Sequence, residues 1–235
     1  MGKSPLYKSL LKFFPKLMDG IRPLVAYHCR KPRPQEKEGV DYYFRSRAFM
    51  ERLRSKKDFV VTEVRGDLTA IDMGQLVKDL AKSSIIFEGN PLMGRMLLRH
   101  RKLQGIKKVN AFLSPLSLEE IHFLFSMKDK LNFEEMLTEI MRKKLLRRTI
   151  KQKGILSMMD LENIEVRAKS AYREVKEAVY FDQIIVNHDG EDSDNWDAFY
   201  FPIGDARRAL NAFTEIIRAG KSSLTEKWPR DLFQR

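Results

Sequence analysis

The chain has 235 residues, and its 44 Lys and Arg against 32 Asp and Glu give a formal net charge of +12. With 43% hydrophobic and 32% charged residues, the composition is that of a folded domain and excludes a disordered chain. No stretch approaches 18 consecutive apolar residues, so we expect a cytoplasmic protein without a membrane span. Cys29 is the only cysteine, which excludes an internal disulfide and a multi-cysteine zinc site. The four scattered histidines disfavour a His-based metal site.

The elements are predicted from apolar periodicity and from breakers. In chain order they are a helix over 5–17, a strand over 24–27, a loop over 29–39, a helix over 48–55, a strand over 59–64, a turn at 66–67, a helix over 73–82, a strand over 84–87, a helix over 91–100, an apolar strand-like run over 109–113, helices over 118–130, 133–153 and 161–179, a strand over 182–187, a surface loop over 193–196, a helix over 204–219 and a loosely attached tail over 220–235.

Short, uniformly apolar strands that alternate with helices are typical of a parallel sheet covered on both faces. The predicted fold class is therefore α/β. The net positive charge predicts a polyanionic partner, either nucleic acid or the phosphates of a nucleotide. A nucleic-acid role is disfavoured, because the aromatic residues of the first helix follow the period of its buried face.

Residues 30–44 carry the strongest chemical signal and read R-K-P-R-P-Q-E-K-E-G-V-D-Y-Y-F. Arg30 and Arg33 lie three residues apart on a proline-stiffened segment, so their guanidinium groups can grip one phosphate with forked hydrogen bonds. The Tyr42 hydroxyl can donate a further hydrogen bond. The pattern predicts a monophosphate-binding loop, and the simpler alternative is an exposed basic turn.

This segment resembles the monophosphate-binding signature of the guanylate kinase family, R-x-P-R-x-x-E-x-x-G-x-D-Y-x-F, at eight spaced positions. Residues 63–67 (E-V-R-G-D), 114–120 (S-P-L-S-L-E-E) and 184–187 (I-I-V-N) are similar to further family motifs in the same order. The segment R-A-K-S-A-Y-R-E, which begins at Arg167, resembles the R-x-x-x-A-x-x-E helix of the family. The resemblance covers residues 2–219.

The resemblance implies a P-loop-type parallel sheet core, a small monophosphate-binding region and an enlarged helical lid. The regions would be a P-loop remnant with the first core helix and strand at 1–29, the monophosphate-binding region at 30–75, core at 76–118, the lid with an insertion at 119–165, core at 166–219 and the tail at 220–235.

Gly2, Lys3 and Ser4 look like the last three residues of a P-loop, in which backbone amides cradle phosphates, Lys neutralises them and Ser ligates Mg²⁺. The resemblance implies ATP as phosphoryl donor and Mg²⁺ as metal. It also implies Arg167 as a catalytic cation and Asn187 as a nucleotide contact, although either residue could instead have a purely structural role.

The strand and glycine-rich half-loop that precede G-K-S in the family are missing from the sequence. Their loss would leave neighbouring strands with unpaired backbone groups, which cost about 1–3 kcal/mol each when buried. We therefore expect translation to start upstream, with Met1 an internal methionine.

Several positions that read the base in the family are altered. Ala26 replaces a serine, Val60 replaces the guanine-reading glutamate and Asn90 replaces an aspartate, while L-T-A-I at 68–71 replaces Y-Y-G-[ST]. These changes remove partners of the base but leave the phosphate grip, so guanine specificity is in doubt.

The basic run in the predicted lid has two interpretations. It could place cations over a triphosphate, or it could be the solvated face of a helix. The residues concerned are Arg142, Lys143, Lys144, Arg147 and Arg148.

The favoured function is phosphoryl transfer from ATP to a nucleoside monophosphate, GMP by default, with Lys3 and Arg167 as catalytic residues. The partners would then be small-molecule nucleotides, and the oligomeric state stays open. The alternative is a catalytically inactive member that binds a phosphorylated or acidic partner through the same pocket.

Overall fold

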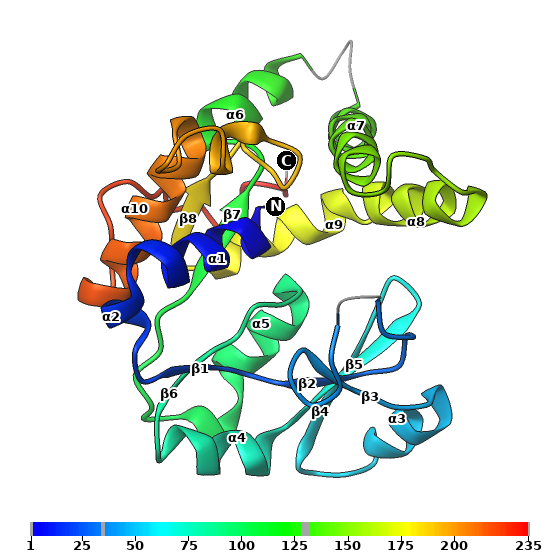
Figure 1. Cartoon of the computed structure of the whole chain (residues 1–235), viewed down its shortest axis with the longest axis vertical. Coiled ribbons are helices and arrows are strands. Elements are labelled where there is room, and N and C mark those ends of the chain that lie inside the picture. Colours follow the sequence, from blue (N-terminus) through cyan, green and yellow to red (C-terminus); the bar gives the residue numbers. More distant parts are fainter. Residues whose placement is uncertain (1, 34–35, 128–131, 235) are drawn as a thin grey trace. The chain divides into compact units, whose positions relative to one another are not determined.

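The computed structural model describes residues 2–33, 36–127 and 132–234, and it divides into two compact units (Figure 1). Unit 1 combines Met1–Asp19 with Lys108–Arg235, and unit 2 is the continuous segment Gly20–Lys107. Met1 and the end of the helix predicted over 118–130 lie outside the described residues. No helix in the described ranges is both long and apolar enough to cross a membrane.

Unit 2 contains two sheets and four helices among its described residues. Its elements are β1 (Ile21–Pro23), β2 (Ala26–His28), β3 (Tyr42–Phe44), α3 (Arg47–Leu53), β4 (Phe59–Val64), β5 (Asp67–Asp72), α4 (Met73–Leu80), β6 (Ser84–Ile86), α5 (Pro91–Arg99) and the 3-10 helix η1 (Arg101–Leu103). β1 and β6 form a parallel pair, and the other strands form a mixed sheet in the order β3-β2-β5-β4.

The hairpin of β4 and β5 turns through two residues, because Val64 pairs with Asp67. The two turn residues, Arg65 and Gly66, have φ values of +56° and +84°. Positive φ at both positions is the geometry of a two-residue type I′ hairpin, which matches the twist of the strands. The turn therefore lies one residue before the predicted position, and residues 68–71 belong to a strand that the sequence pattern did not predict.

Among its described residues, unit 1 contains one parallel pair of strands and most of the helices. Its elements are α1 (Lys3–Phe13), α2 (Pro15–Met18), β7 (Ala111–Ser114), α6 (Leu118–Ser126), α7 (Phe133–Lys153), α8 (Met158–Lys169), α9 (Ala171–Lys176), η2 (Glu177–Tyr180), β8 (Gln183–Val186), η3 (Asp194–Trp196) and α10 (Gly204–Ala219). β7 and β8 pair in parallel, from Ala111 with Gln183 to Ser114 with Val186.

The α/β fold class is confirmed by parallel strand pairs and intervening helices. The first predicted helix is split, because Pro15 begins α2 directly after the break at Phe14. Pro at the first helical position lacks only an N–H that would have no partner there, so it starts α2 while it ends the hydrogen-bond ladder of α1. The division into functional regions stays a prediction.

The segment predicted as a surface loop is held against the core of unit 1. It forms η3, and Trp196 is 8% exposed. The indole N–H of Trp196 donates to the carbonyl oxygens of Asp189 and Gly190 at 2.8 and 3.0 Å. The prediction of a surface loop was wrong because one large aromatic residue among polar neighbours shows no periodicity. The burial of Trp196 nevertheless holds this segment against the core.

The tail after α10 is packed, contrary to the expectation that it is loosely attached. Trp228 and Leu232 are 1% and 2% exposed. The backbone of Glu226 exchanges two hydrogen bonds with Ile184 of β8, at 2.8 and 2.9 Å. The Glu226 carboxylate accepts a hydrogen bond from the Leu118 N–H at the start of α6, at 2.9 Å. The tail therefore connects β8 to α6 within unit 1.

Replacement of Trp228 by alanine tests this packing. We expect W228A to lower the free energy of unfolding by about 3–5 kcal/mol, because the indole is fully buried and its removal leaves a cavity. Urea unfolding followed by circular dichroism measures the change. F199A is the control, since Phe199 is 70% exposed. A W228A variant as stable as F199A would contradict the packed tail.

Candidate functional site

Arg30 is held by a carboxylate of its own loop. Its two terminal nitrogens donate to the two oxygens of Glu36, each at 2.5 Å. The side chains of Arg30 and Glu36 are 17% and 15% exposed, so the pair is largely withdrawn from water. The guanidinium also lies over the rings of Tyr42 and Phe44, 5.2 and 5.6 Å from their centroids. These contacts fix the orientation of Arg30 at the end of β2.

Arg33 converges on the same carboxylate. Its backbone N–H donates to Glu36 at 2.8 Å, and its Nη1 lies 3.8 Å from the second Glu36 oxygen. Burial raises the pKa of Glu36, but the bonds from Arg30 and Arg33 outweigh it and hold the pKa below its usual range. Both arginines of the predicted phosphate grip are thus arranged around one anion. Burial raises the pKa of Tyr42, whose side chain is half-buried in β3.

Most of the positions that differ from the family's base-reading residues are apolar and buried. Ala26 and Val60 belong to one core cluster, and Leu68 and Ala70 belong to another. The side chain of Asn90 accepts a hydrogen bond from the Leu92 N–H at 2.9 Å and caps α5. In place of polar base-reading side chains, this part of unit 2 therefore has hydrophobic core and a helix cap.

The first turn of α1 packs closely on the loop after β8. Gly2 has a φ of +73°, and a Cβ there would lie 2.6 Å from Nδ2 of Asn187, so glycine is required on both counts. Asn187 is fully buried, and its amide donates to the carbonyl of Asp189 at 2.8 Å. Its amide therefore shapes the turn, and its contact with a nucleotide stays a prediction. Lys3 and Ser4 are exposed at the start of the helix.

Glu191, in the same loop, is a partly buried carboxylate of unit 1 that is surrounded by positive charge, as Glu36 is in unit 2. Nε of Arg148 in α7 lies 2.6 Å from its carboxylate, and the two side chains are 19% and 18% exposed. Burial raises the pKa of Glu191, but the positive charges of Arg148, Lys3 and Arg167 outweigh it and keep the pKa below its usual range. The two predicted catalytic cations of unit 1 therefore act electrostatically on one carboxylate, which the sequence analysis did not single out.

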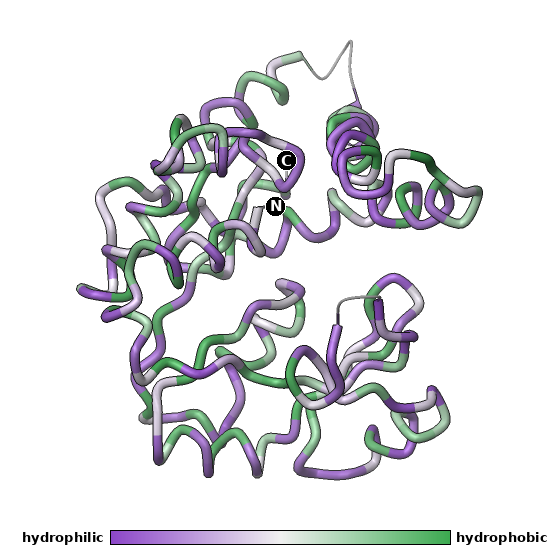
Figure 2. The backbone as a smooth tube through the Cα atoms, viewed as in Figure 1, coloured by the Kyte–Doolittle hydropathy of each residue, from purple (hydrophilic) through white to green (hydrophobic). Residues whose placement is uncertain are grey.

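The basic face of α7 is in part paired with the acidic loop after β8. Lys144 donates to the carbonyl of His188 and lies 4.0 Å from Asp192, while Lys151 pairs with Asp194. Figure 2 shows that hydrophilic residues cover much of α7. The basic run of α7, for which the sequence offered two interpretations, thus forms in part a surface that pairs with the acidic loop of the same unit.

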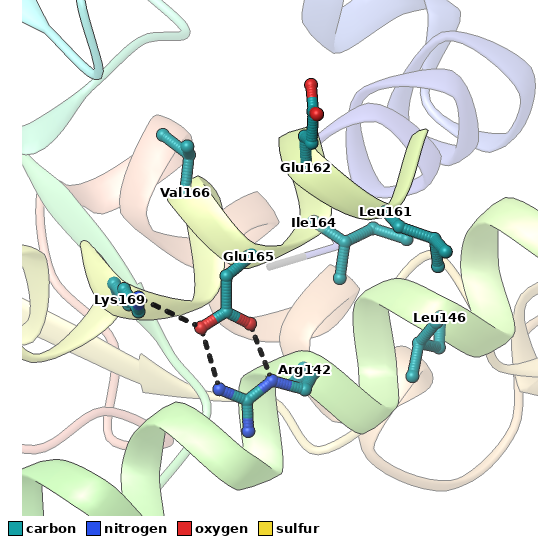
Figure 3. A pocket seen from close by; sticks show the side chains of 8 residues that line it. All are labelled: Arg142, Leu146, Leu161, Glu162, Ile164, Glu165, Val166 and Lys169. Atoms are coloured by element: carbon teal, nitrogen blue, oxygen red, sulfur yellow. Dashed lines mark hydrogen bonds and ion pairs between the residues drawn. The ribbon is translucent and has the colours of Figure 1, made fainter. Parts of the chain in front are cut away.

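Arg142 extends from α7 toward α8, not toward the loop after β8. A shallow pocket between α7 and α8 is lined by Arg142, Leu146, Leu161 and Glu165 (Figure 3). The guanidinium donates to both oxygens of Glu165 at 2.7 and 3.0 Å, which lowers the pKa of Glu165 to about 2. Arg142 is therefore occupied in fastening α8. Lys143 and Arg147 are exposed, as the solvated-face interpretation expects.

His188 lies between two carboxylates of unit 1. Its Nδ1 contacts Asp205 of α10, and its Nε2 lies 3.0 Å from Glu120 of α6. Burial alone would lower the pKa of His188, but the hydrogen bonds that its ring donates to Asp205 and Glu120 outweigh burial and raise the pKa. The protonated imidazole therefore links the starts of two helices, where carboxylates are favoured by the helix dipole.

This arrangement predicts a pH-dependent contribution to stability. Because the folded pKa of His188 is raised, the contribution is complete below about pH 6.5 and is lost as the pH rises through the folded pKa. We expect H188Q to lower the unfolding free energy at about pH 6 by no more than about 1 kcal/mol, since the ring is nearly half exposed, and to have less effect at about pH 9. Urea unfolding at both pH values measures it, with H122Q at an exposed position as control. An H188Q effect that is equal at both pH values would contradict the assignment.

Comparisons with known proteins show which proteins the chain is similar to. No family model matches the chain. The guanylate kinase of Thiobacillus denitrificans is 30% identical over 190 residues, which cover 80% of this chain and 74% of that protein. The guanylate kinase of Geobacter sulfurreducens is 26% identical over 79% of this chain and 75% of its own length. The guanylate kinase of Homo sapiens is 27% identical over 76% of this chain and 86% of its own length.

A solved structure extends the likeness to the fold. The crystal structure of guanylate kinase from Anaplasma phagocytophilum matches with a TM-score of 0.51 at 20% identity, over 99% of this chain and 90% of that one. The structural match defines an α/β fold of the P-loop kinase type. With the sequence relatives, it shows that the chain belongs to the guanylate kinase family.

Proposed function

We propose that the chain transfers a phosphoryl group from ATP to a nucleoside monophosphate, with GMP as the default acceptor by family. Unit 2 would hold the acceptor phosphate through Arg30, Arg33 and Tyr42. Unit 1 would hold the donor phosphates through Gly2, Lys3 and Ser4, while Arg167 offsets charge in the transition state. Catalysis would then consist of positioning and electrostatic stabilisation.

One observation carries the proposal. In each unit, the cations that the sequence predicts to bind phosphate act on a single, partly buried carboxylate: Arg30 and Arg33 on Glu36, and Lys3 and Arg167 on Glu191. An array of cations arranged around an anion is suited to a phosphate, which carries more charge and more acceptor oxygens than a carboxylate. The carboxylates would be displaced when a nucleotide binds.

Ser4 fits the role of a magnesium ligand. Mg²⁺ takes oxygen ligands and, in nucleotide sites, obtains most of them from phosphates and water. The hydroxyl of Ser4 is exposed in the first turn of α1, where it is accessible to an ion carried by the donor phosphates. When bound, Mg²⁺ would neutralise charge on the transferring phosphoryl group.

A coupled ADP-release assay with each nucleoside monophosphate tests the activity. We expect R33A to lower kcat/KM for the acceptor by about 10–100-fold, mainly through KM, because one phosphate contact is lost. Arg33 is the better choice than Arg30, since its side chain is 59% exposed and its removal leaves the Arg30–Glu36 pair in place. K31A, at an exposed position on the same loop, is the matched control.

For the donor site, variants of Lys3 and Lys8 form a matched pair in the same assay. K3A should lower kcat, whereas K8A, exposed on the same helix, should not. Because most of the base-reading positions are apolar, we expect GMP and AMP to differ by less than about a hundredfold in kcat/KM. Equal activity of R33A and K31A, or of K3A and K8A, would contradict the assigned sites.

Glu191 provides a test of the displaced-carboxylate interpretation. We expect E191Q to bind ATP about tenfold more tightly, because the nucleotide no longer competes with a charge-assisted pair worth roughly 1.5–3 kcal/mol. Isothermal titration of ATP measures the affinity. D194N is the matched control, since it removes the same charge from the same loop at the partner of Lys151. Weaker ATP binding by E191Q than by D194N would contradict competition.

The second candidate is a catalytically inactive binding module for a phosphorylated or acidic partner. The observation that favours it is the apolar core at the base-reading positions, together with cations that are already paired. In this case no monophosphate would release ADP, while phosphopeptide binding would depend on Arg33.

A further inference from the structure

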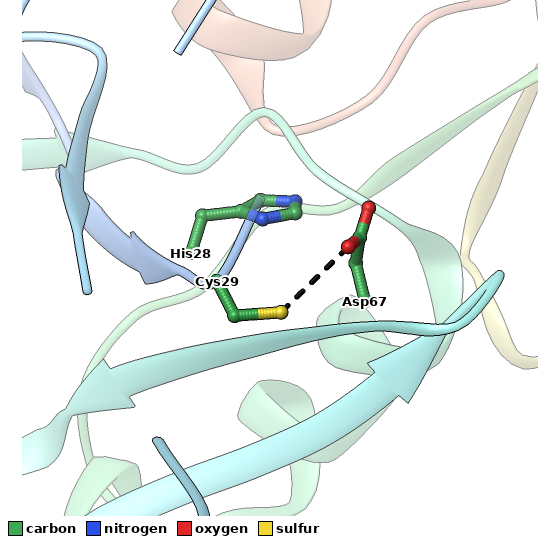
Figure 4. Close-up of side chains that lie close together, drawn as sticks. All are labelled: His28, Cys29 and Asp67. Atoms are coloured by element: carbon green, nitrogen blue, oxygen red, sulfur yellow. Dashed lines mark hydrogen bonds between the residues drawn. The ribbon is translucent and has the colours of Figure 1, made fainter. Parts of the chain in front are cut away.

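Three side chains of different chemistry meet at the end of β2, beside the loop that carries Arg30 and Arg33 and that would hold the acceptor phosphate (the acceptor loop). The Nδ1 or Nε2 of His28, the Sγ of Cys29 and a carboxylate oxygen of Asp67 all lie within 4.8 Å of one another (Figure 4). The thiol of Cys29 contacts the Asp67 carboxylate at 3.7 Å, across 38 positions of the sequence. All three residues are partly buried, so the cluster is shielded but still accessible.

These are the three ligand types that zinc prefers. Zn²⁺ binds thiolate at about 2.3 Å, imidazole at about 2.0–2.1 Å and carboxylate at about 2.0–2.2 Å, in a tetrahedral arrangement whose ligand atoms lie about 3.5 Å apart. The Sγ–carboxylate distance of 3.7 Å is already close to this separation. The remaining atoms, within 4.8 Å, need only small side-chain movements. Three protein ligands leave the fourth position to water.

One backbone hydrogen bond and the charges of the ligands are compatible with a bound divalent metal. The Leu68 N–H donates to the Sγ of Cys29 at 3.0 Å, and this bond would stabilise a thiolate. A thiolate and a carboxylate together cancel the charge of Zn²⁺, so the occupied site adds no net positive charge beside Arg30 and Arg33.

We propose that His28, Cys29 and Asp67 form a binding site for a borderline divalent transition metal, of which Zn²⁺ is the best match. The site lies in unit 2, and its three ligands are distinct from the residues assigned to the proposed kinase activity. The spacing of the histidines and of the single cysteine disfavoured a His-based metal site in the sequence. Asp67 reaches the other two ligands only through the pairing of β2 with β5, which spacing does not show.

Metal binding is linked to the acceptor loop through one hydrogen bond. The Arg30 N–H donates to Nδ1 of His28 at 3.2 Å. If the metal binds Nδ1, it replaces this N–H. If it binds Nε2, the neutral ring carries its proton on Nδ1, which then no longer accepts the bond. In both cases the backbone of Arg30 loses its acceptor, so an occupied site shifts the start of the loop.

Titration of the purified full chain with Co²⁺, followed by displacement with Zn²⁺, tests the proposal. We expect a thiolate-to-Co²⁺ charge-transfer absorption in the near ultraviolet that saturates at one equivalent. Since Cys29 is the only cysteine, this absorption can arise from no other side chain of the chain. C29S should abolish it, and H28Q and D67N should each weaken Co²⁺ binding by at least about tenfold.

H100Q is the matched control. His100 makes the same local contact as His28, since its Nδ1 accepts a hydrogen bond from the N–H two residues on, at 3.2 Å. H100Q should therefore bind Co²⁺ as the unchanged protein does. Absence of the absorption, or an absorption that H28Q and D67N leave unchanged, overturns the proposal, because Cys29 would then bind metal alone or not at all.

A measurement on the unchanged protein keeps the proposal testable even if a variant fails to fold. X-ray absorption at the zinc edge should show one sulfur at about 2.3 Å and nitrogen or oxygen ligands at about 2.0–2.2 Å. A zinc environment without sulfur overturns the site.

Discussion

A guanidinium that is withdrawn from water must keep an anionic partner, because an uncompensated buried charge costs several kcal/mol. This constraint organises the charged parts of the molecule. Arg30 is held by Glu36, and Arg148 is held by Glu191. Each pair fixes a loop or a helix that carries candidate functional residues, so the electrostatics that orient the cations also stabilise the fold around them.

For the proposed phosphate binding, the same constraint means that the ligand must replace a carboxylate that already pairs with the cations. A phosphate that approaches Arg30 and Arg33 meets a site in which Glu36 already satisfies the cations. The affinity of the proposed phosphate ligand would then be the difference between two sets of charge-assisted bonds, and would be smaller than a count of the new contacts suggests. The benefit is that the cations are oriented before the ligand arrives, which lowers the entropic cost of binding.

The sequence predicted the elements whose information is local. The strand over 59–64 and the helices over 133–153 and 204–219 have the predicted bounds, because their periodicity and caps lie within the segment. β5 was missed, since a turn signal precedes it and a helix follows it directly. Burial of Trp196 and Trp228 was missed because isolated aromatic residues in polar segments gain their partners only in the tertiary structure.

The candidate sites show the same division. The arginines of the acceptor loop could be found from spacing, since they lie on one short segment. Glu191 could not be found from spacing, because its cationic partner Arg148 belongs to α7, a distant segment of the sequence. The cluster around Cys29 was missed for a similar reason, since its carboxylate comes from the neighbouring strand of a mixed sheet.

The way the two units are drawn from the chain has a consequence for synthesis. Unit 2 is continuous, so it can fold on the ribosome as soon as Lys107 has emerged. Unit 1 combines the first residues with the last, and Trp228 and Leu232 complete its core. α1 packs against α10, so its apolar face stays without this partner on the nascent chain until the segment up to Ala219 has been translated.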